Sequence, residues 1–378
     1  MTLSGMEIAL DLEFPAENED DNWTKFFQQI SAVSSSDMVH NVRTKMRVEK
    51  TTLGAPLPIT INSSEFDNSY VCSPYTAYFS YAEQELCKID SAVVRVSSKI
   101  AINLLKKPMR KLGINKVIYV NNWLLSTNLY PKVSHANVRS LTSQYISKYK
   151  NHFLGWRSLN EHSNHNLIET LREYGYDLIP SRQVYIFPRE KNFKDRKNSM
   201  RDLRLLRETP FRVVKIESAS CQDLTRFKRL YDQLYLEKYS YHNPQFTENF
   251  IRSSLDSKTI KLFGLKNQNG EWQGVVGCLV RNGVMTTPVV GYNTDLPQKL
   301  GIYRTLMVIT LCEAQRLGVD LNLSSGASKF KILRGGFPFV EYTAIYRRHL
   351  SKSRQLMIVT LKKVLDTIVV PIMKKHEL

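Results

Sequence analysis

The sequence is poor in the residues that build covalent or metal cross-links. Its five cysteines are scattered along 378 residues, with no Cys-x-x-Cys pair and no Cys/His cluster. The eight histidines show no metal-ligand spacing either. These absences argue against a disulfide framework and a zinc site, and they favour free thiols in a reducing compartment. We therefore predict no metal in the site.

Long apolar runs and an early basic segment are also missing. No run approaches the roughly 18 apolar residues that a bilayer-spanning helix needs, and no lysine or arginine precedes Lys25. We expect neither a membrane span nor a secretion signal, so the predicted location is the cytoplasm. No Ser/His/Asp arrangement for nucleophilic catalysis is visible.

Positive charge, in contrast, is abundant. The chain has 53 lysines and arginines against 35 acidic residues, a net charge of +18. Seven of the acidic residues fall within the first 22 positions, which leaves +25 on the remainder. Such a field attracts polyanions: nucleic acid, phosphorylated cofactors or an acidic carrier protein. The alternative is the ordinary lysine-rich surface of a basic protein.

The length is about twice that of a usual domain and predicts two domains. We expect an acidic disordered segment at 1–22, a first domain at 23–190, a second at 211–350 and a C-terminal helix at 351–378. Between the domains, residues 191–210 belong to a stretch with many basic and few apolar residues, which predicts a basic connection. A solvated helix face is the competing interpretation of that stretch.

The order of expected elements repeats. The second half predicts two helices, a strand, a hairpin that turns at Asn282-Gly283, a helix that ends at Gly318, and two further strands. The first half predicts a hairpin or a bent strand over 114–131, then helix, strand, helix and strand, with the last helix ending at Gly175. We infer an internal duplication from this shared order, because the halves show no visible sequence identity.

One segment carries a family resemblance: "VVGYNTDLPQKLGIYRTLMVITLCEAQRLGVDLNLSSGASKFKILRGGFPFVEY", residues 289–342. It resembles a GNAT-fold acyltransferase domain of the double-GNAT group, which contains the Fem-type peptidoglycan-bridge transferases. The resemblance is weaker over 219–274 and rests on element order in the first half. It implies an α/β (α+β) fold with two GNAT-like domains, each a mixed twisted sheet flanked by helices. It also implies acyltransferase activity.

The resemblance places a donor-binding loop at the start of the helix near residue 302. The usual GNAT pyrophosphate loop is (Arg/Gln)-x-x-Gly-x-(Gly/Ala). Gln298 and Gly301 fit it, with Lys299 between them, whereas Tyr303 stands where a small residue is expected and could obstruct the pyrophosphate of coenzyme A. The alternative is an ordinary helix start after Pro297. A helix start offers free N–H groups to phosphate, and Arg304 could add a charge or lie exposed. Fem-type members use aminoacyl-tRNA and lack this loop.

The chemistry that the resemblance implies is direct attack of an amine on an activated carbonyl. It requires positioning and oxyanion stabilisation rather than a covalent intermediate. By resemblance to a Phe-Lys pair of the family, Lys331 would lie beside the reacting carbonyl; alternatively its stem packs on Phe330. Tyr292 could relay a proton and Asn293 could orient a carbonyl, unless both only form a turn.

Substrate-binding candidates come from polar residues in strand-like runs. We expect Asn122, Arg157, Asn160 and Arg182 of the first half to line an acceptor groove, with Ser325 and Glu341 of the second half near the acceptor amine. Structural hydrogen bonding is the equal alternative for these residues, because buried polar groups must find partners.

The predicted function is therefore an N-acyltransferase with no permanently bound cofactor. Its donor substrate would be acyl-CoA or another acyl thioester, such as one on an acyl carrier protein. Its acceptor would be the amine of an amino acid or small metabolite. The first alternative is a Fem-type transferase that uses aminoacyl-tRNA, which the positive charge also favours. The second is a non-catalytic nucleic-acid-binding protein.

Overall fold

The computed structural model describes residues 19–88 and 91–376. The predicted disordered segment 1–22 lies outside the described residues except for 19–22, which begin a helix, and the last two residues of the predicted C-terminal helix lie outside them as well. The chain divides into two compact units. Of the described residues, unit 1 contains 19–32, 185–241 and 246–338, and unit 2 contains 33–88, 91–184, 242–245 and 339–376.

Each unit combines segments that are separated in the sequence, whereas the sequence suggested two consecutive domains. The N-terminal helix α2 (Glu19–Ser31) belongs to unit 1, where Phe26 packs edge-on against Phe250 at 5.7 Å between ring centroids. Trp23 lies under the Arg281 guanidinium at 4.4 Å. Burial of these large aromatic faces outweighs the sequence distance, because apolar area removed from water stabilises wherever its partner comes from.

Unit 2 has a sheet that is covered on both faces. In chain order its elements are α3 (Ser35–Met38), β1 (Lys45–Lys50), β2 (Pro56–Asn62), η1 (Thr76–Ser80), α4 (Tyr81–Glu85), η2 (Leu86–Lys88), α5 (Ala92–Lys111), β3 (Val117–Val120), α6 (His135–Lys148), β4 (Phe153–Leu159), α7 (Glu161–Glu173), β5 (Asp177–Phe187), β11 (Phe337–Tyr346), α13 (Lys352–Val364), η6 (Leu365–Val369) and α14 (Val370–His376). The last residues of β5 and the first of β11 are assigned to unit 1.

The strand order in unit 2 is β1-β2-β3-β4-β11-β5. Alternate residues of β3 enter different cores, as a strand's two-residue period requires. Ile118 and Val120 join a core with α6 and α7 residues, whereas Val117 and Tyr119 join one with α5 and α13 residues. The near-continuous apolar sequence of β3 follows from this two-sided burial.

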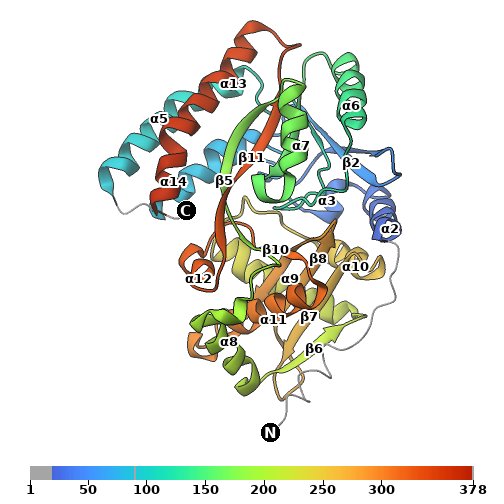
Figure 1. The fold of residues 1–378 in the computed structure, drawn as a ribbon, viewed down its shortest axis with the longest axis vertical. Coiled ribbons are helices and arrows are strands. Elements are labelled where there is room, and N and C mark those ends of the chain that lie inside the picture. Colours follow the sequence, from blue (N-terminus) through green and yellow to red (C-terminus); the bar gives the residue numbers. More distant parts are fainter. Residues whose placement is uncertain (1–18, 89–90, 377–378) are drawn as a thin grey trace. The chain divides into compact units, whose positions relative to one another are not determined.

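Unit 1 contains, besides α2, the elements η3 (Phe193–Asp195), α8 (Lys197–Glu208), β6 (Arg212–Ile216), α9 (Cys221–Asp232), η4 (Gln233–Glu237), α10 (Glu248–Asp256), β7 (Ile260–Lys266), β8 (Trp272–Arg281), β9 (Val284–Tyr292), η5 (Gln298–Leu300), α11 (Ile302–Leu317), β10 (Asp320–Asn322) and α12 (Ser328–Ile332). Its strand order is β10-β9-β8-β7-β6, with the end of β5 beside β10. Figure 1 labels the helices of this unit from α8 to α12 and its strands β6, β7, β8 and β10.

Each unit contains one parallel strand pair joined by a helix. In unit 2, β3 and β4 are parallel, with Val117–Val120 beside Phe153–Trp156, and α6 connects them. In unit 1, β9 and β10 are parallel over Val284–Thr286 and Asp320–Asn322, and α11 connects them. Such strand-helix-strand connections place the carboxyl ends of both strands at one edge, where α/β proteins usually bind ligands.

Two stretches for which the sequence left alternatives open have a definite structure. The basic stretch at 191–210 forms η3 and α8, and Leu203 and Leu206 on one face of this helix are buried in the core of unit 1. The run 114–131 forms one short strand, β3, rather than a hairpin, because Asn121 at φ 56° turns the chain away after Val120. Within the described ranges, no helix is both long and apolar enough to cross a membrane.

Candidate functional site

A buried polar cluster lies in unit 2 where β3 and β4 end. It brings together four of the predicted substrate-binding residues: Asn122 just after β3, Arg157 in β4, Arg182 in β5 and Glu341 in β11. Asn122 and Glu341 are almost fully buried, at 0% and 2% exposure. Buried charge and amide groups at one sheet edge are expensive to maintain without partners, so each of these residues needs an explanation.

Arg157 is the residue whose hydrogen bonds are least complete. Its side chain is buried, at 7% exposure. Nη1 donates to Asn122 Oδ1 at 3.1 Å and to the Leu125 carbonyl at 3.4 Å, and the guanidinium lies 5.7 Å from the Tyr119 ring centre. Within residues 19–88 and 91–376, neither a carboxylate ion pair nor a partner for Nε or Nη2 is found. Two donor nitrogens of a buried cation thus remain available.

Asn122 holds Arg157 in place. Its Nδ2 donates to Thr60 Oγ1 and to the Val71 carbonyl, both at 2.9 Å, so that its Oδ1 faces the guanidinium. The amide is thereby fixed by three hydrogen bonds, which is the arrangement that orients a functional side chain through its neighbours.

The backbone beside Arg157 is strained. Ser158 has a φ of +63°, in the left-handed region that non-glycine residues rarely adopt. Its hydroxyl oxygen is buried without a hydrogen-bond partner among the described residues. The register between β4 and β11 also shifts here, between Tyr342 and Ala344. Strain and an unsatisfied polar atom at the end of a strand are features that concentrate at functional sites.

The other two charged residues of the cluster, Arg182 and Glu341, pair with each other. Arg182 Nε donates to Glu341 Oε1 at 2.8 Å and its Nη2 to Oε2 at 3.3 Å. Nη2 also donates to the Ser126 carbonyl at 2.6 Å and to Thr127 Oγ1 at 3.0 Å. Burial lowers the pKa of Arg182, but the Glu341 carboxylate outweighs this and leaves it raised. The pair therefore ties the segment after β3 to β5 and β11.

Neutral groups surround the guanidinium. Burial raises the pKa of the Cys72 thiol to about 12, although nearby Arg157 opposes the shift. Burial likewise raises the pKa of Tyr78 to about 12, against a hydrogen bond from Thr343 and the charge of Arg157. Both groups are neutral near pH 7, so neither supplies an anion to balance Arg157.

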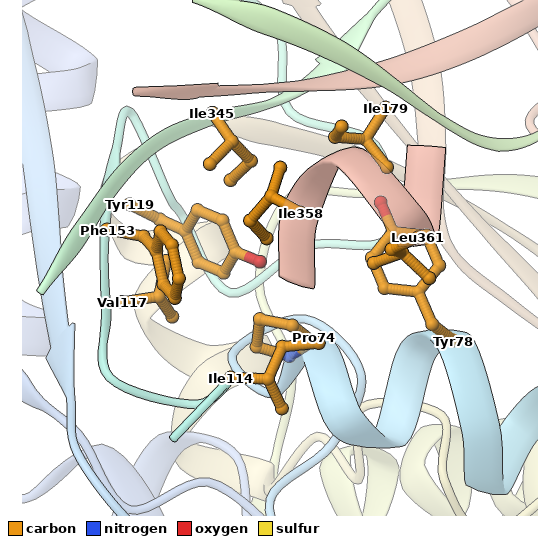
Figure 2. A pocket seen from close by; sticks show the side chains of 10 residues that line it. All are labelled: Pro74, Tyr78, Ile114, Val117, Tyr119, Phe153, Ile179, Ile345, Ile358 and Leu361. Atoms are coloured by element: carbon orange, nitrogen blue, oxygen red, sulfur yellow. The ribbon is translucent and has the colours of Figure 1, made fainter. Parts of the chain in front are cut away.

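A small apolar pocket adjoins the cluster on the same face of the sheet. Figure 2 shows its lining, in which the Tyr78 and Tyr119 rings bring the only hydroxyl groups. The other lining residues are Pro74, Ile114, Val117, Phe153, Ile179, Ile345, Ile358 and Leu361. Tyr119 has room for its ring because position 155 is glycine: a Cβ there would lie 2.8 Å from it. Tyr119 therefore connects the pocket to Arg157.

Asn160, the fifth predicted substrate-binding residue of this region, caps a helix. Asn160 is buried and its Oδ1 accepts from the Ser163 N–H at 2.9 Å, which caps the start of α7. It therefore stands beside the cluster with a structural role of its own.

No group of histidine, cysteine and acidic residues suited to a metal occurs among the described residues.

In unit 1, Lys331 is buried at 3% exposure, on α12. Its Nζ donates to three main-chain carbonyls, those of Leu323 at 2.7 Å, Ser324 at 3.2 Å and Ser325 at 2.8 Å. An ammonium has three N–H donors, and all three have partners here. The lysine thus holds the turn after β10, in which Ser324 has a φ of +57°. Ser325 contributes only its main-chain carbonyl to this contact.

Tyr292 and Asn293 also lie in unit 1, at the end of β9. The Tyr292 hydroxyl accepts from Lys238 Nζ at 3.2 Å. Asn293 pairs with Gln273, Nδ2 donating to Oε1 at 2.9 Å, and its own Oδ1 accepts from the Asp295 N–H. Asn293 therefore forms the kind of side-chain turn that asparagine favours.

The predicted phosphate loop at the start of α11 is filled by side chains. Tyr303 packs between Phe330 and Tyr292, with ring centres 5.1 and 6.1 Å away, and burial raises its pKa. A Cβ built on Gly301, at φ +63°, would lie 2.5 Å from Leu205 Cδ2, so α8 covers the helix start. Gln298 and Lys299 are exposed in η5.

Arg304 pairs with a carboxylate of the protein. Its Nη2 lies 2.6 Å from Asp202 Oδ1, and Arg334 binds the other oxygen of the same buried aspartate. Neither arginine is therefore left to a phosphate in this arrangement.

The cluster in unit 2 thus contains four predicted residues and several that were missed, above all Ser158, Tyr78 and Thr343. Nothing in the sequence marks a single serine within a strand. The repeated polar residues of "NNWLLSTN" were the available signal, and they led to Asn122.

No protein-family model and no curated protein matches the chain. Among solved structures, the C-terminal domain of a putative lysylphosphatidylglycerol synthetase from Agrobacterium fabrum is 9% identical, with a TM-score of 0.51 over 92% of this chain and 98% of that one. L-PGS from Bacillus licheniformis is 13% identical, with a TM-score of 0.46 over 60% and 78%. A tandem GNAT protein from the clavulanic acid pathway is 9% identical, with a TM-score of 0.36 over 61% and 75%.

At these identities the similarity concerns the fold. The predicted α/β fold class is confirmed: the chain has a mixed α/β architecture in which helices flank a mixed sheet. Unit 1 follows the element order from β6 through α9 and α10 to the strands β7, β8 and β9, then α11, β10 and α12.

Proposed function

We propose that this protein is an acyltransferase that moves an acyl group from an activated donor to an amine, with the carbonyl of that group held at Arg157. The observation that carries the proposal is the buried Arg157 guanidinium, which has two free donor nitrogens and no carboxylate partner among the described residues. A buried cation without a counter-charge is costly, and a substrate oxygen that develops negative charge would offset the cost.

The step would proceed by direct attack. The amine nitrogen forms a bond to the carbonyl carbon, and the electron pair of the C=O bond moves onto oxygen, where Arg157 donates hydrogen bonds. When the tetrahedral intermediate collapses, the bond to the leaving oxygen or sulfur breaks, and that atom takes up the proton released by the amine. Arginine remains charged throughout, so it stabilises the oxyanion without taking part in proton transfer.

Other residues of the cluster would position rather than react. Asn122 fixes the guanidinium, and the Arg182–Glu341 pair holds the segment after β3 through Ser126 and Thr127. Both Glu341 oxygens are engaged by Arg182, so we assign the acceptor amine no direct contact with Glu341. Lys331 would keep a structural task, since its three donors hold the turn after β10.

Between the two donor classes, the start of α11 favours aminoacyl-tRNA over acyl-CoA. Tyr303 and Leu205 occupy the place where a pyrophosphate would approach the helix N-terminus. The matching helix of unit 2, α6, is closed as well, because Ser134 caps it by accepting from the Asn137 N–H. The net charge of +18 also suits a polyanionic donor.

A donor-consumption assay tests the proposal. The protein is incubated with a pool of free amino acids and small amines, and with either an acyl-CoA panel or total aminoacyl-tRNA, and new amides are sought by mass spectrometry. We expect amide formation from aminoacyl-tRNA. Amide formation from acyl-CoA alone would retain the acyl transfer and reverse the donor assignment. Binding of tRNA without consumption of any donor would favour the non-catalytic nucleic-acid-binding alternative.

Arg157→Gln then tests the assigned residue. Loss of one oxyanion donor typically lowers turnover by about 100-fold or more, and we expect kcat/KM of R157Q to fall by that factor. Its melting temperature should hold or rise, because an uncompensated buried charge is removed. Arg281→Gln, which removes another fully buried arginine in unit 1, is the matched control and should retain turnover per folded molecule. Turnover of R157Q within threefold of the parent would remove Arg157 from the mechanism.

A further inference from the structure

Helix α5 of unit 2 presents an unusual surface. Its twenty residues, Ala92–Lys111, include six basic residues and neither an acidic nor an aromatic one. Four aliphatic side chains on it are strongly exposed: Val93 at 79%, Val96 at 57%, Ile100 at 55% and Leu104 at 70%. Their spacings of three, four and four residues place them in one line along the helix.

The opposite face of α5 accounts for its attachment to unit 2. Ile102 and Leu105 pack on the core that also contains Leu361 and Leu365, and Met109 is 2% exposed. The exposed line is therefore separate from the face that the fold needs. Solvent-exposed aliphatic residues in a continuous line mark an interaction surface more often than scattered ones do.

Two cations, Lys107 and Lys111, continue this line beyond Leu104 at spacings of three and four residues, and others lie elsewhere on the exposed surface of α5. Arg95, Lys99, Lys107 and Lys111 are exposed and form no ion pair with any residue that the structure describes. Lys106, in contrast, pairs with Glu83, and Arg110 lies over the Phe66 ring at 4.6 Å. Four cations are thus left for an external partner.

The neighbouring C-terminal helices also carry exposed aliphatic side chains. Leu356 and Val359 of α13 and Ile368 of η6 are 63%, 41% and 42% exposed. With the four residues of α5 they make seven of the fifteen exposed large apolar side chains found among the described residues. Helices α5 and α13 share one core cluster, and Figure 1 shows them in the same part of unit 2.

We propose that α5, with α13 and η6, docks unit 2 on the surface of an anionic lipid bilayer. Aliphatic side chains would enter the boundary between headgroups and acyl chains, and the unpaired cations would meet lipid phosphates. The absence of aromatic residues from α5 argues against single-stranded nucleic acid, which needs stacking platforms. This docking concerns location and does not depend on the proposed acyl transfer.

Vesicle co-sedimentation of the full chain tests the proposal. The probes are vesicles of phosphatidylcholine alone and vesicles that also contain phosphatidylglycerol or phosphatidylserine. We expect binding to both anionic compositions and none to phosphatidylcholine, with binding weakened by salt. Binding to only one of the anionic lipids would indicate a specific headgroup site instead of a charged surface, and would overturn the proposal. The absence of binding to both would overturn it as well.

Two pairs of variants assign the surface. Ile100→Glu with Leu104→Glu removes the aliphatic line, and Lys107→Gln with Lys111→Gln removes the cations that continue it. Each should lower the partition coefficient by about tenfold or more. The matched controls are Val48→Glu with Leu53→Glu, at other exposed aliphatic residues of unit 2, and Arg201→Gln with Arg204→Gln, on α8.

The controls should bind as the parent does, with all melting temperatures unchanged. Equal loss in the α8 variant would show that net charge alone drives binding, and would overturn the assignment to α5. Analytical ultracentrifugation of I100E/L104E covers the remaining case: a dimer of the parent that this variant abolishes, without lipid binding by either, would assign the line to a second copy of the chain.

Discussion

In unit 2, the carboxyl ends of parallel strands β3 and β4 surround a guanidinium with unused hydrogen-bond donors. In unit 1, the segment that follows β10 closes on Lys331, whose three donors all bind carbonyls. The two places are equivalent in topology, since each pair is connected by a helix. The guanidinium in unit 2 has unused hydrogen-bond donors, whereas every donor of the ammonium in unit 1 has a partner.

The difference also concerns the connecting helices. The start of α6 is capped by the Ser134 side chain, and that of α11 is covered by Leu205 and Tyr303. A shared element order therefore does not imply a shared site, because function depends on the side chains that the strand ends present. The comparison directs the search for chemistry to unit 2.

The largest expected effect on stability comes from a buried ion pair in each unit. Glu341→Gln in unit 2 leaves Arg182 without its carboxylate, and Asp202→Asn in unit 1 leaves Arg334 without one. We expect each to lower the free energy of unfolding by about 3–5 kcal/mol, because a buried charge loses its partner. Chemical denaturation measures it. A loss below about 1 kcal/mol in either variant would mean that water replaces the carboxylate.

Lys331→Met sharpens the comparison between Arg157 and Lys331. Methionine keeps the apolar stem but leaves three carbonyls without a donor, so we expect a loss of about 2 kcal/mol. Turnover per folded molecule should be unchanged in the acyl-transfer assay. Lys329→Met, at an exposed position on the same helix, is the control for stability and should have no effect. A selective loss of turnover in K331M with intact stability would return the chemistry to unit 1.

Gly301→Ala probes the closed start of α11. The substitution strains a backbone at φ +63° and pushes a Cβ against Leu205, so we expect a loss of about 1–2 kcal/mol. Gly318→Ala at the other end of α11 has nearly the same φ, +64°, and nothing within 4 Å of the added Cβ. The difference between their thermal denaturation curves isolates the contact with α8. Equal losses would mean that Leu205 moves aside freely.

The smallest expected effect is a dependence of stability on pH that belongs to unit 2 alone. All eight histidines lie in the ranges of unit 2, and burial lowers the pKa of His152, His242 and His349. As pH falls through about 6.5, the unfolded chain binds protons on these imidazoles before the folded chain does. Stability should therefore decrease on acidification from that pH and be unaffected above it.

Thermal denaturation between about pH 7 and about pH 5.5 measures this decrease. His152→Asn combined with His349→Gln should flatten it, whereas a substitution at exposed His165 should not. An unchanged slope in the double variant would contradict the assignment to buried imidazoles.

The sequence predicted the fold class and much of the secondary structure. Apolar periodicity together with Gly175 and Gly318 located the ends of two helices, because a left-handed glycine ends a helix by a local rule. Local rules left two interpretations open for the stretch that contains α8, a connection and a solvated helix face. The two leucines that α8 buries determine its place in unit 1.

Candidate site residues were predictable as a set of polar side chains and not as an arrangement. The Phe-Lys resemblance directed attention to Lys331, but a sequence does not show that three carbonyls converge on its ammonium. Similarly, Arg157 and Ser158 stand next to each other in an ordinary strand sequence. The strain at Ser158 and the free donors of Arg157 appear only when β4 has its neighbours.

By itself, therefore, the sequence determined local and additive properties: net charge, helix ends, the alternation of β3 between two cores, and the acid-free aliphatic line of α5. Tertiary structure alone decided which polar residues meet. Asn122 and Arg157 are 35 positions apart, and Arg182 and Glu341 are 159 apart. Their contacts depend on strand order and register, where a shift of one residue turns every side chain to the other face of the sheet.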